Sequence, residues 1–441
     1  MRTSPWSEVR CHPCGNRTVN PEWSSLSSAP PWRYGEGGKG VPDSRNVVSH
    51  PDVRIEASRP RSARKQVFIP VHSVGIGQRL LDVAELLDCD PRISLVFAAA
   101  PVSTSNGVEG LLREAGVAVL DWRHALARRH DLVITTNHDR LCQLNAPTVV
   151  IPDPRGRLRP ALRLPCERRE PSPVDIHDAG GKPCPARDPS LRLAAHKEDR
   201  QAVPDCRHSL ADRVEVVGDL TFDRLHLSIR SRDTYRAALG VHARHQLVVV
   251  VSTWGPDSLI TREPRLLRQL TVELPEVRYR IAVLLHPAAW FSHDITHLKA
   301  WMTTARTASV QIIDPFTQWR PIIAAADLVI SARGSITLYS TGIGLPVLYA
   351  DPTPSATISL NHDSQPDETP QLCLDTDLQT QLDIAARWHT KEMQCLAVRH
   401  VTSIPGQAGH FTRSAIYRML ELVPPSTTPL ITPIRGPRRM T

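Results

Sequence analysis

Short apolar runs alternate with helix-like segments along most of the chain, and this alternation is the strongest constraint on its fold. Runs of strand length and buried character occur at residues 67–71, 132–135 and 247–252. Between them lie segments whose apolar residues recur at helical spacing, such as 79–87. Strands that alternate with helices at this interval form parallel sheets with helices on both faces. The chain is therefore predicted to be an α/β protein.

The alternation runs twice through the chain, which predicts two doubly wound domains. The first is assigned to residues 66–212 and the second to residues 213–423. Strands are expected in the first domain at 67–71, 93–98, 117–120, 132–135 and 148–151, and in the second at 214–217, 247–252, 280–285, 310–313, 328–331 and 346–350. Residues 152–210 hold ten prolines and interrupt the pattern. A long loop region with one helix near 193–201 is expected there.

The two ends of the chain carry its excess of positive charge. Residues 1–65 have a net charge of +5, and residues 424–441 have a net charge of +3, which together equal the formal +8 of the whole chain. The body between them is formally neutral, which argues against a specific nucleic-acid surface. Neither end keeps a strand or helix period, so both are predicted to be disordered. Peripheral contact of these basic ends with an anionic membrane surface stays open as an alternative.

The sequence does not favour a membrane-spanning, secreted or metal-binding protein. No apolar run approaches the roughly 18 residues that a membrane span needs. The first residues lack the apolar core of a secretory signal. Cys11 and Cys14 have a C-x-x-C spacing but no second pair, whereas a structural zinc site needs four ligands. We expect a cytoplasmic protein with no metal and no cofactor.

Polar residues follow three strands of the predicted second domain, where doubly wound sheets bind their ligands. They are Ser252, Thr253, Trp254, His286, Arg333, Gly334, Ser335 and Thr337. A helix capped by Ser335 would offer free amides to an anion, and Arg333 and His286 would add donors. The set predicts a phosphate site with Trp254 as a surface for a stacked ring. Each motif is also compatible with an ordinary turn or helix cap at a strand end.

The first domain has a glycine-bearing turn after its first strand. His72 follows the strand at 67–71, and Gly75 and Gly77 lie within the predicted turn at 72–77. The spacing is not that of the G-x-G-x-x-G dinucleotide loop. Two doubly wound domains leave a cleft between the carboxyl ends of their sheets. The turn is therefore assigned to the acceptor side of such a cleft.

Several of these segments together resemble the GT-B transferases. Residues 218–225, Gly-Asp-Leu-Thr-Phe-Asp-Arg-Leu, are similar to the G-x-P-x-x-D-R-L segment that opens the second domain in that superfamily. His286-Pro287 matches a strand that ends in His-Pro. Residues 331–337 match the turn and helix that hold the donor diphosphate, and 345–347 resemble the strand that follows. The most similar branch is that of the CDP-glycerol glycerophosphotransferase-like enzymes, which is itself similar to the nucleotide-sugar 2-epimerases.

This resemblance implies a GT-B-like fold, with two Rossmann-like domains that face a cleft. It also implies transfer of a glycosyl or glycerophospho group from a nucleotide-diphosphate-linked donor to a hydroxyl acceptor. The family usually carries a His-Gly pair after a first-domain strand, whereas this chain has Asp153 at that place. His72 and Asp153 are therefore the candidate catalytic bases. A non-catalytic nucleotide-binding or scaffold protein, and a sugar-nucleotide epimerase, remain the alternatives.

Overall fold

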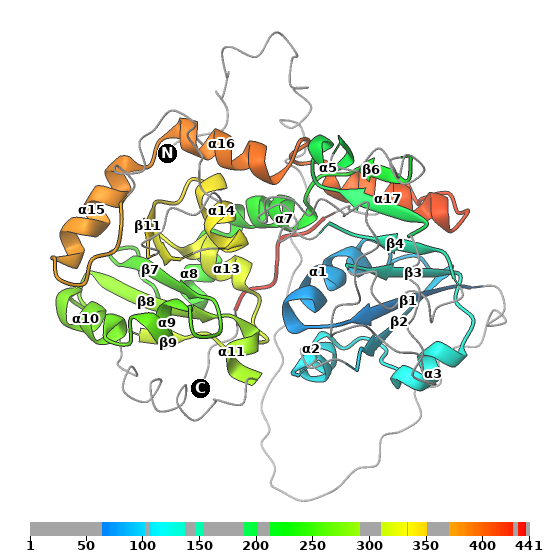
Figure 1. Ribbon diagram of the computed structural model, residues 1–441, viewed down its shortest axis with the longest axis horizontal. Helices are drawn as coiled ribbons and strands as arrows, with labels where there is room; N and C mark the ends of the chain where they lie inside the picture. Colours follow the sequence, from blue (N-terminus) through cyan, green and yellow to red (C-terminus); the bar gives the residue numbers. More distant parts are fainter. Residues whose placement is uncertain are drawn as a thin grey trace, which may run out of the picture. The chain divides into compact units, whose positions relative to one another are not determined.

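The computed structural model describes residues 64–101, 106–136, 146–152, 189–201, 212–291, 310–332, 334–350, 370–426 and 431–437. All the described residues belong to one compact unit, which begins at Arg59. Within this unit the strands form two parallel sheets with helices around them (Figure 1). The predicted α/β class is therefore confirmed. The predicted arm at 1–65 lies almost entirely outside the described residues.

The first sheet has six strands in the order β2-β1-β3-β4-β5-β6. They are β1 (Lys65–Val71), β2 (Ile93–Ala99), β3 (Leu132–Thr135), β4 (Thr148–Val150), β5 (Leu191–Ala194) and β6 (Val214–Val216). Val67 of β1 pairs with Leu95 on one side and with Leu132 on the other. The strand order reverses between β1 and β3, and such a reversal opens a crevice at the carboxyl edge of a doubly wound sheet.

The second sheet has five strands in the order β11-β10-β7-β8-β9. They are β7 (Gln246–Ser252), β8 (Tyr279–Leu285), β9 (Val310–Ile312), β10 (Leu328–Ser331) and β11 (Val347–Tyr349). Here the order reverses between β7 and β10. The apolar runs predicted at 247–252, 280–285 and 328–331 thus occupy three adjacent central strands, where both faces are buried.

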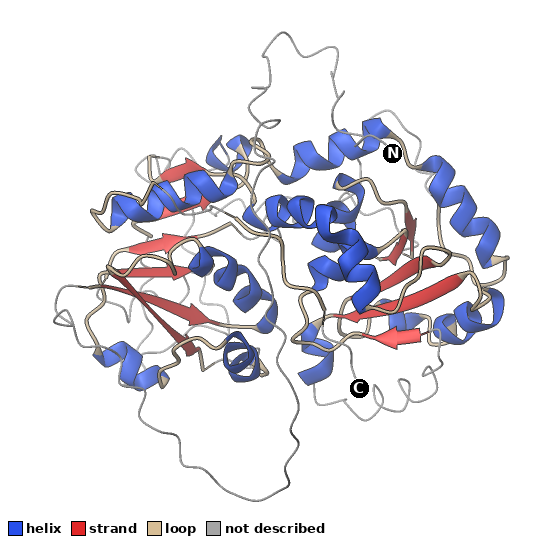
Figure 2. Cartoon of the chain, turned by 180° about the vertical axis from the view of Figure 1, so that it is seen from behind, coloured by secondary structure: helices blue, strands red, loops and turns tan. Residues whose placement is uncertain are grey.

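Helices cover both faces of each sheet (Figure 2). Around the first sheet lie α1 (Val74–Glu85), α2 (Val108–Ala115), α3 (Trp122–Ala127) and α5 (Lys197–Gln201). The second sheet is accompanied by α7 (Leu220–Ser228), the 3-10 turn η6 (Ile229–Ser231), α8 (Arg232–Ala238), α9 (Leu259–Arg262), α10 (Leu266–Glu273), α11 (Pro287–Phe291), α13 (Trp319–Ala325), α14 (Ser335–Gly342) and α15 (Leu378–Trp388). Two further helices, α16 (Lys391–Val401) and α17 (Ala408–Met419), follow.

The first sheet draws on more of the chain than the predicted boundary at 212/213 allows. The strand expected to open the second domain is β6, and its Leu193–Glu215 pairing joins it to β5 of the first sheet. At the far end of the chain, α17 buries Ala415, Ile416 and Tyr417 in the core of the same sheet. Hydrophobic periodicity identifies a strand or helix but not the sheet it joins, so these two assignments required the tertiary structure.

Three local predictions also differ from the structure. The region 152–210 was expected to hold a single helix near 193–201, but its described part contains strand β5 followed by helix α5. The strand expected at 117–120 is only a bridge between Val119 and Phe97. Helix α1 begins at Val74, five residues before the predicted start, because Ser73 caps it by accepting a hydrogen bond from the amide of Ile76.

Part of the predicted disordered tail at 424–441 is packed against the body. The amide of Ile434 donates to the Ser228 hydroxyl at 3.2 Å, and the Tyr235 hydroxyl donates to the Ile434 carbonyl at 2.5 Å. The Ile434 side chain is only 6% exposed. These contacts show that the segment 431–437 is an ordered strap on the helices α7 and α8, which corrects the prediction for those residues.

Candidate functional site

The carboxyl edge of the second sheet gathers the three loops singled out in the sequence. Strands β10, β7 and β8 are neighbours, and Ser331 pairs with Val251 while Ser252 pairs with Leu285. The residues that follow these strands therefore emerge side by side at one edge. This is the arrangement that ligand sites of doubly wound sheets use.

The half-buried His286 and the exposed Trp254 lie next to each other at this edge. The His286 amide donates to the Ser252 carbonyl at 2.9 Å, which continues the strand pairing into the loop. The His286 Nδ1 accepts a hydrogen bond from the amide of Ala288 at 3.1 Å. The neutral ring therefore carries its proton on Nε2. The Trp254 ring is 54% exposed, and its centroid lies 6.3 Å from that of His286.

The turn after β10 differs from the prediction in one respect. Gly334, not Ser335, is the N-cap of α14, and no side chain caps this helix. Its φ of 141° lies in the range that favours glycine, and a Cβ built there would have no neighbour within 4 Å. Ser335 is the first helical residue. Arg333, the predicted guanidinium of this turn, lies outside the described residues.

Two of the predicted ligand-binding hydroxyls are turned into the protein. Thr337 is 2% exposed, and its hydroxyl lies 2.8 Å from that of Ser331. Ser252 is also 2% exposed, and its hydroxyl accepts from the Ile260 amide at 3.3 Å. Both hydroxyls therefore stabilise the loops that follow β10 and β7. Within the described part of the predicted donor set, the groups that keep some exposure are Thr253, Trp254, His286, Gly334 and Ser335.

At the first sheet, the predicted glycine turn is the start of a helix. His72 is half-buried between β1 and the N-cap of α1. Gly75 and Gly77 both lie inside α1. A Cβ on Gly77 would approach the Leu111 side chain to 2.5 Å, so this glycine lets α2 pack closely against α1. The assignment of Gly77 to an acceptor loop is therefore wrong. Asp153 lies outside the described residues.

The segment 218–225, which carried the resemblance, acts as a structural junction. Gly218 has a φ of 86°, and Asp219 caps α7 by accepting from the Phe222 amide at 2.8 Å. Asp223 accepts hydrogen bonds from the backbone amides of Gly406 and Ala408 at 2.7 and 2.8 Å, so it holds the start of α17. Burial raises the pKa of Asp223 to about 7, although these two amides favour its ionised form.

A buried group of charges, not predicted from the sequence, links α1 to α7 and α13. Asp82 of α1 is 2% exposed. It accepts a hydrogen bond from Arg224 of α7 at 2.6 Å and forms an ion pair with Arg320 of α13. Glu85 pairs with the other nitrogen of Arg224 at 2.8 Å. The signal in the sequence was Asp82 at an apolar helix face, which requires a buried partner.

A second buried contact lies beside this group. The Tyr339 side chain of α14 is completely buried. Its hydroxyl donates to Asp219 at 2.7 Å and accepts from the guanidinium of Arg79 at 2.7 Å. The Tyr339 ring stacks on Trp319 with a centroid distance of 5.8 Å. Burial raises the pKa of Tyr339, so the phenol stays protonated and can keep donating to Asp219.

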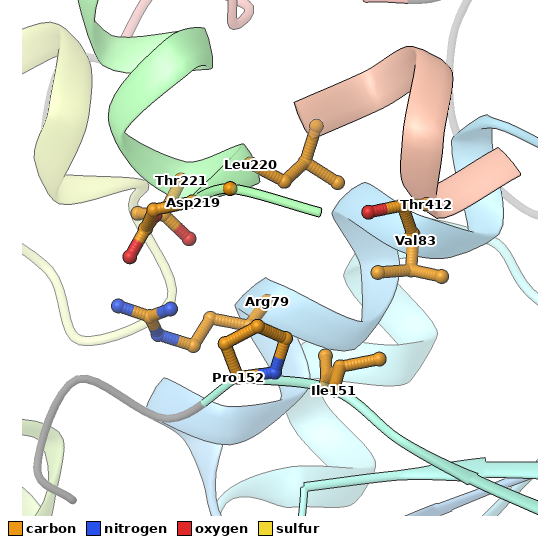
Figure 3. Close-up of a pocket in the computed structure, with 9 residues that line it drawn as sticks. Arg79, Val83, Ile151, Pro152, Asp219, Leu220, Thr221 and Thr412 are labelled. Carbon is orange, nitrogen blue, oxygen red and sulfur yellow. The ribbon is translucent and has the colours of Figure 1, made fainter. Parts of the chain in front are cut away.

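A small pocket opens next to Arg79 and Asp219 (Figure 3). Its walls come from α1, the end of β4, the start of α7, and α17, and its lining residues are Arg79, Val83, Ile151, Pro152, Gly218, Asp219, Leu220, Thr221 and Thr412. The cavity of about 20 Å³ has room for about one ordered water. It is therefore too small to be the substrate site by itself.

Two further features concern metals and membranes. No group of three or more His, Cys, Asp or Glu side chains that could hold a metal ion occurs among the described residues. Cys11 and Cys14 fall outside them. In the same part of the chain, every helix is too short or too polar to cross a membrane.

Comparison with known proteins gives structural relatives only. No protein-family model and no curated protein matches the chain. The wall teichoic acid polymerase TagF matches with a TM-score of 0.54 at 12% identity, covering 81% of this chain and 89% of that chain. A TagF variant soaked with CDPG matches with a TM-score of 0.52 at 10% identity, covering 82% and 91%. The Anabaena protein Alr3699/HepE in complex with UDP and glucose gives 0.43 at 15% identity, covering 82% and 100%.

The two TagF matches cover most of both chains and include both sheets of this one. Together with the two doubly wound sheets, they show that the chain has the GT-B fold. Identities of this size establish the fold alone, so the chemistry has to be argued from the residues at the edge of the second sheet.

Proposed function

We propose that this chain is a GT-B transferase that uses a nucleotide-diphosphate-linked donor and passes a glycosyl or glycerophospho group to a hydroxyl acceptor. The observation that carries the proposal is the convergence of the loops after β7, β8 and β10 on one edge of the second sheet. The GT-B fold and the match to a polymerase soaked with CDPG support the same reading.

The diphosphate of the donor would lie against the start of α14. The first-turn amides of this eight-residue helix have no side-chain cap, and Gly334 keeps the space beside its own α-carbon clear. Amides at a helix start carry a partial positive charge that favours phosphate oxygens. His286 would contribute its Nε2 proton from the loop after β8, and Trp254 offers an exposed ring face for stacking from the loop after β7.

In the transfer, the acceptor oxygen forms a bond to the donor carbon or phosphorus as the bond to the leaving phosphate oxygen breaks. The electron pair stays on that oxygen, where the α14 amides and His286 stabilise the growing negative charge. The acceptor proton passes to a base, for which His72 and Asp153 are the candidates. His72 directly follows the carboxyl end of β1, and the strand order of the first sheet reverses between β1 and β3.

Calorimetric titration with CDP, UDP, GDP and dTDP tests the donor site. A charge-assisted hydrogen bond is worth about 1.5–3 kcal/mol, so His286→Ala should weaken binding of the preferred nucleotide by about 10- to 100-fold. Arg333→Ala is expected to act in the same direction. The matched control is His124→Ala, because the His124 side chain is 80% exposed on α3 and should leave binding unchanged. Equal affinities for the wild type, His286→Ala and Arg333→Ala would contradict the proposal.

Turnover separates the transferase from its alternatives. A transferase should release nucleotide from an activated donor faster when a hydroxyl acceptor is added. An epimerase would alter the donor without any acceptor. Nucleotide binding with neither reaction would favour the scaffold protein, which the aspartate at position 153 in place of the family's histidine already suggests as the second candidate.

A further inference from the structure

Tyr339 is the fifth residue of α14, the helix whose first turn is the proposed phosphate site. Its hydroxyl accepts a hydrogen bond from Arg79 on α1 and donates one to Asp219 at the N-cap of α7, so it connects the two side chains. Figure 3 draws the Arg79 guanidinium pointing toward the Asp219 side of the pocket. The phenol hydroxyl therefore lies between a half-buried cation and a buried carboxylate and contacts both.

The ring of Tyr339 is fixed independently of its hydroxyl. It stacks on Trp319 at 5.8 Å with planes 10° apart, and on Phe222 at 6.1 Å. Arg79 also lies 5.9 Å above its centre. Removing the hydroxyl alone would keep these ring contacts. It would remove the hydrogen bonds of the hydroxyl to Asp219 and Arg79, so the hydroxyl can be tested separately from the packing.

We propose that Tyr339 is a positioning residue, whose hydroxyl holds the first turn of α14 in the place where its amides meet the donor diphosphate. The inference rests on the proposed function. Tyr339 does not reach the ligand itself, because its side chain is completely buried. It acts through the helix: a hydrogen bond to α1 and one to α7 together fix the rotation and the height of α14 above β10.

The site needs such an anchor because the turn before α14 is weakly held. Gly334 has no side chain, and no side-chain hydrogen bond caps the helix. The contact of Thr337 with Ser331 ties one side of the first turn to the strand end. Tyr339 lies four residues after Ser335, one turn further along α14, and its hydroxyl ties this second turn to α1 and α7.

The test compares Tyr339→Phe with Tyr235→Phe. Tyr235 is a suitable control because it is 1% exposed, packs in the same core and loses a hydroxyl that donates to the Ile434 carbonyl. We expect Tyr339→Phe to weaken CDP binding by about 5- to 20-fold, because one hydrogen-bonded anchor is lost. It should also speed hydrogen exchange of the amides at 339–342, which donate within α14. Tyr235→Phe should keep CDP affinity within twofold and leave that exchange unchanged.

The outcomes separate this inference from the proposed function. A merely structural role for Tyr339 would lower the thermal midpoint of both variants equally and leave the CDP dissociation constant at 10 °C unchanged, which would overturn the inference. If His286→Ala weakens CDP binding and Tyr339→Phe does not, the donor site stands and the positioning role falls. If the wild type binds none of CDP, UDP, GDP and dTDP, the proposed function fails. Hydrogen exchange at 339–342, measured without nucleotide, then decides whether Tyr339 anchors α14.

Discussion

Replacing Asp82 by asparagine should be among the most destabilising single polar substitutions in this protein. Asp82 is the shared partner of two arginine side chains, Arg224 and Arg320, which are 4% and 1% exposed. The amide of asparagine carries no charge, so Arg320 would lose its paired carboxylate and Arg224 would keep only the half-exposed Glu85. Breaking a buried ion pair from one side costs about 3–5 kcal/mol, because the remaining charge is left uncompensated.

The contacts that the two arginines would keep place the cost of Asp82→Asn within this range of about 3–5 kcal/mol. Arg224 would keep its contact with Glu85 at 2.8 Å, and Arg320 would keep Gln318 at 2.6 Å. The Nε of Arg320 has no hydrogen-bond partner among the described residues, so the cost of breaking the ion pair stays within the range for a buried pair. We therefore expect Asp82→Asn to lower the free energy of unfolding by about 3 kcal/mol, the low end of the range for a broken buried pair.

Urea unfolding followed by far-UV circular dichroism measures this loss. The control is Glu85→Gln one turn further along α1, where the side chain is 55% exposed and the change should cost at most about 1 kcal/mol. Adding Arg320→Met to Asp82→Asn should recover part of the loss, because it removes an unpaired buried cation. The reasoning would be refuted if Asp82→Asn and Glu85→Gln had the same unfolding midpoint and slope.

Two other predictions concern packing and pH. Gly77→Ala should destabilise the protein by about 1–3 kcal/mol through overpacking against Leu111, whereas Gly75→Ala, where a Cβ meets nothing within 4 Å, should be neutral or slightly stabilising; equal unfolding midpoints would contradict the packing role. Burial raises the folded-state pKa of Asp223 to about 7 from its ordinary 3.8, so the folded protein holds this proton longer than the unfolded chain. Its contribution to stability is therefore complete below about pH 4 and is lost as the pH rises to 7. From pH 5 to pH 8 the urea midpoint should fall by more for the wild type than for Asp223→Asn. Parallel pH profiles of the two proteins would contradict the raised pKa of Asp223.

Much of the secondary structure could be predicted from the sequence because it depends on local patterns. The central strands β1, β7, β8 and β10 are continuous apolar runs, and such runs are buried on both faces of a parallel sheet. The placement of His286 and the Ser331–Ser335 turn at strand ends followed directly from those runs. The GT-B fold was expected from the short motifs around residues 218–225 and 286–287, and the TagF matches bear it out.

The contacts that join distant segments could not be predicted in this way. Strand β6 and helix α17 have ordinary strand and helix patterns, and a pattern does not identify the sheet against which an element packs. The Asp-Arg pair at 223–224 resembled part of the segment that opens the second domain of GT-B transferases. In the structure Asp223 accepts from the amides at the start of α17, and Arg224 pairs with Asp82. Partners 142 residues apart in the chain leave no periodic signal.

The sequence by itself determined most of the strands and helices, and which side chains stand at the ends of the central strands. These features depend on apolar periodicity and on turn chemistry within a few residues. Only the tertiary structure decided that Ser252 and Thr337 face inward, that Gly77 serves helix packing, and that Tyr339 bridges Arg79 and Asp219. The physical reason is that burial and hydrogen bonding of a polar side chain depend on which distant atoms surround it after folding, and local sequence carries little information about those atoms.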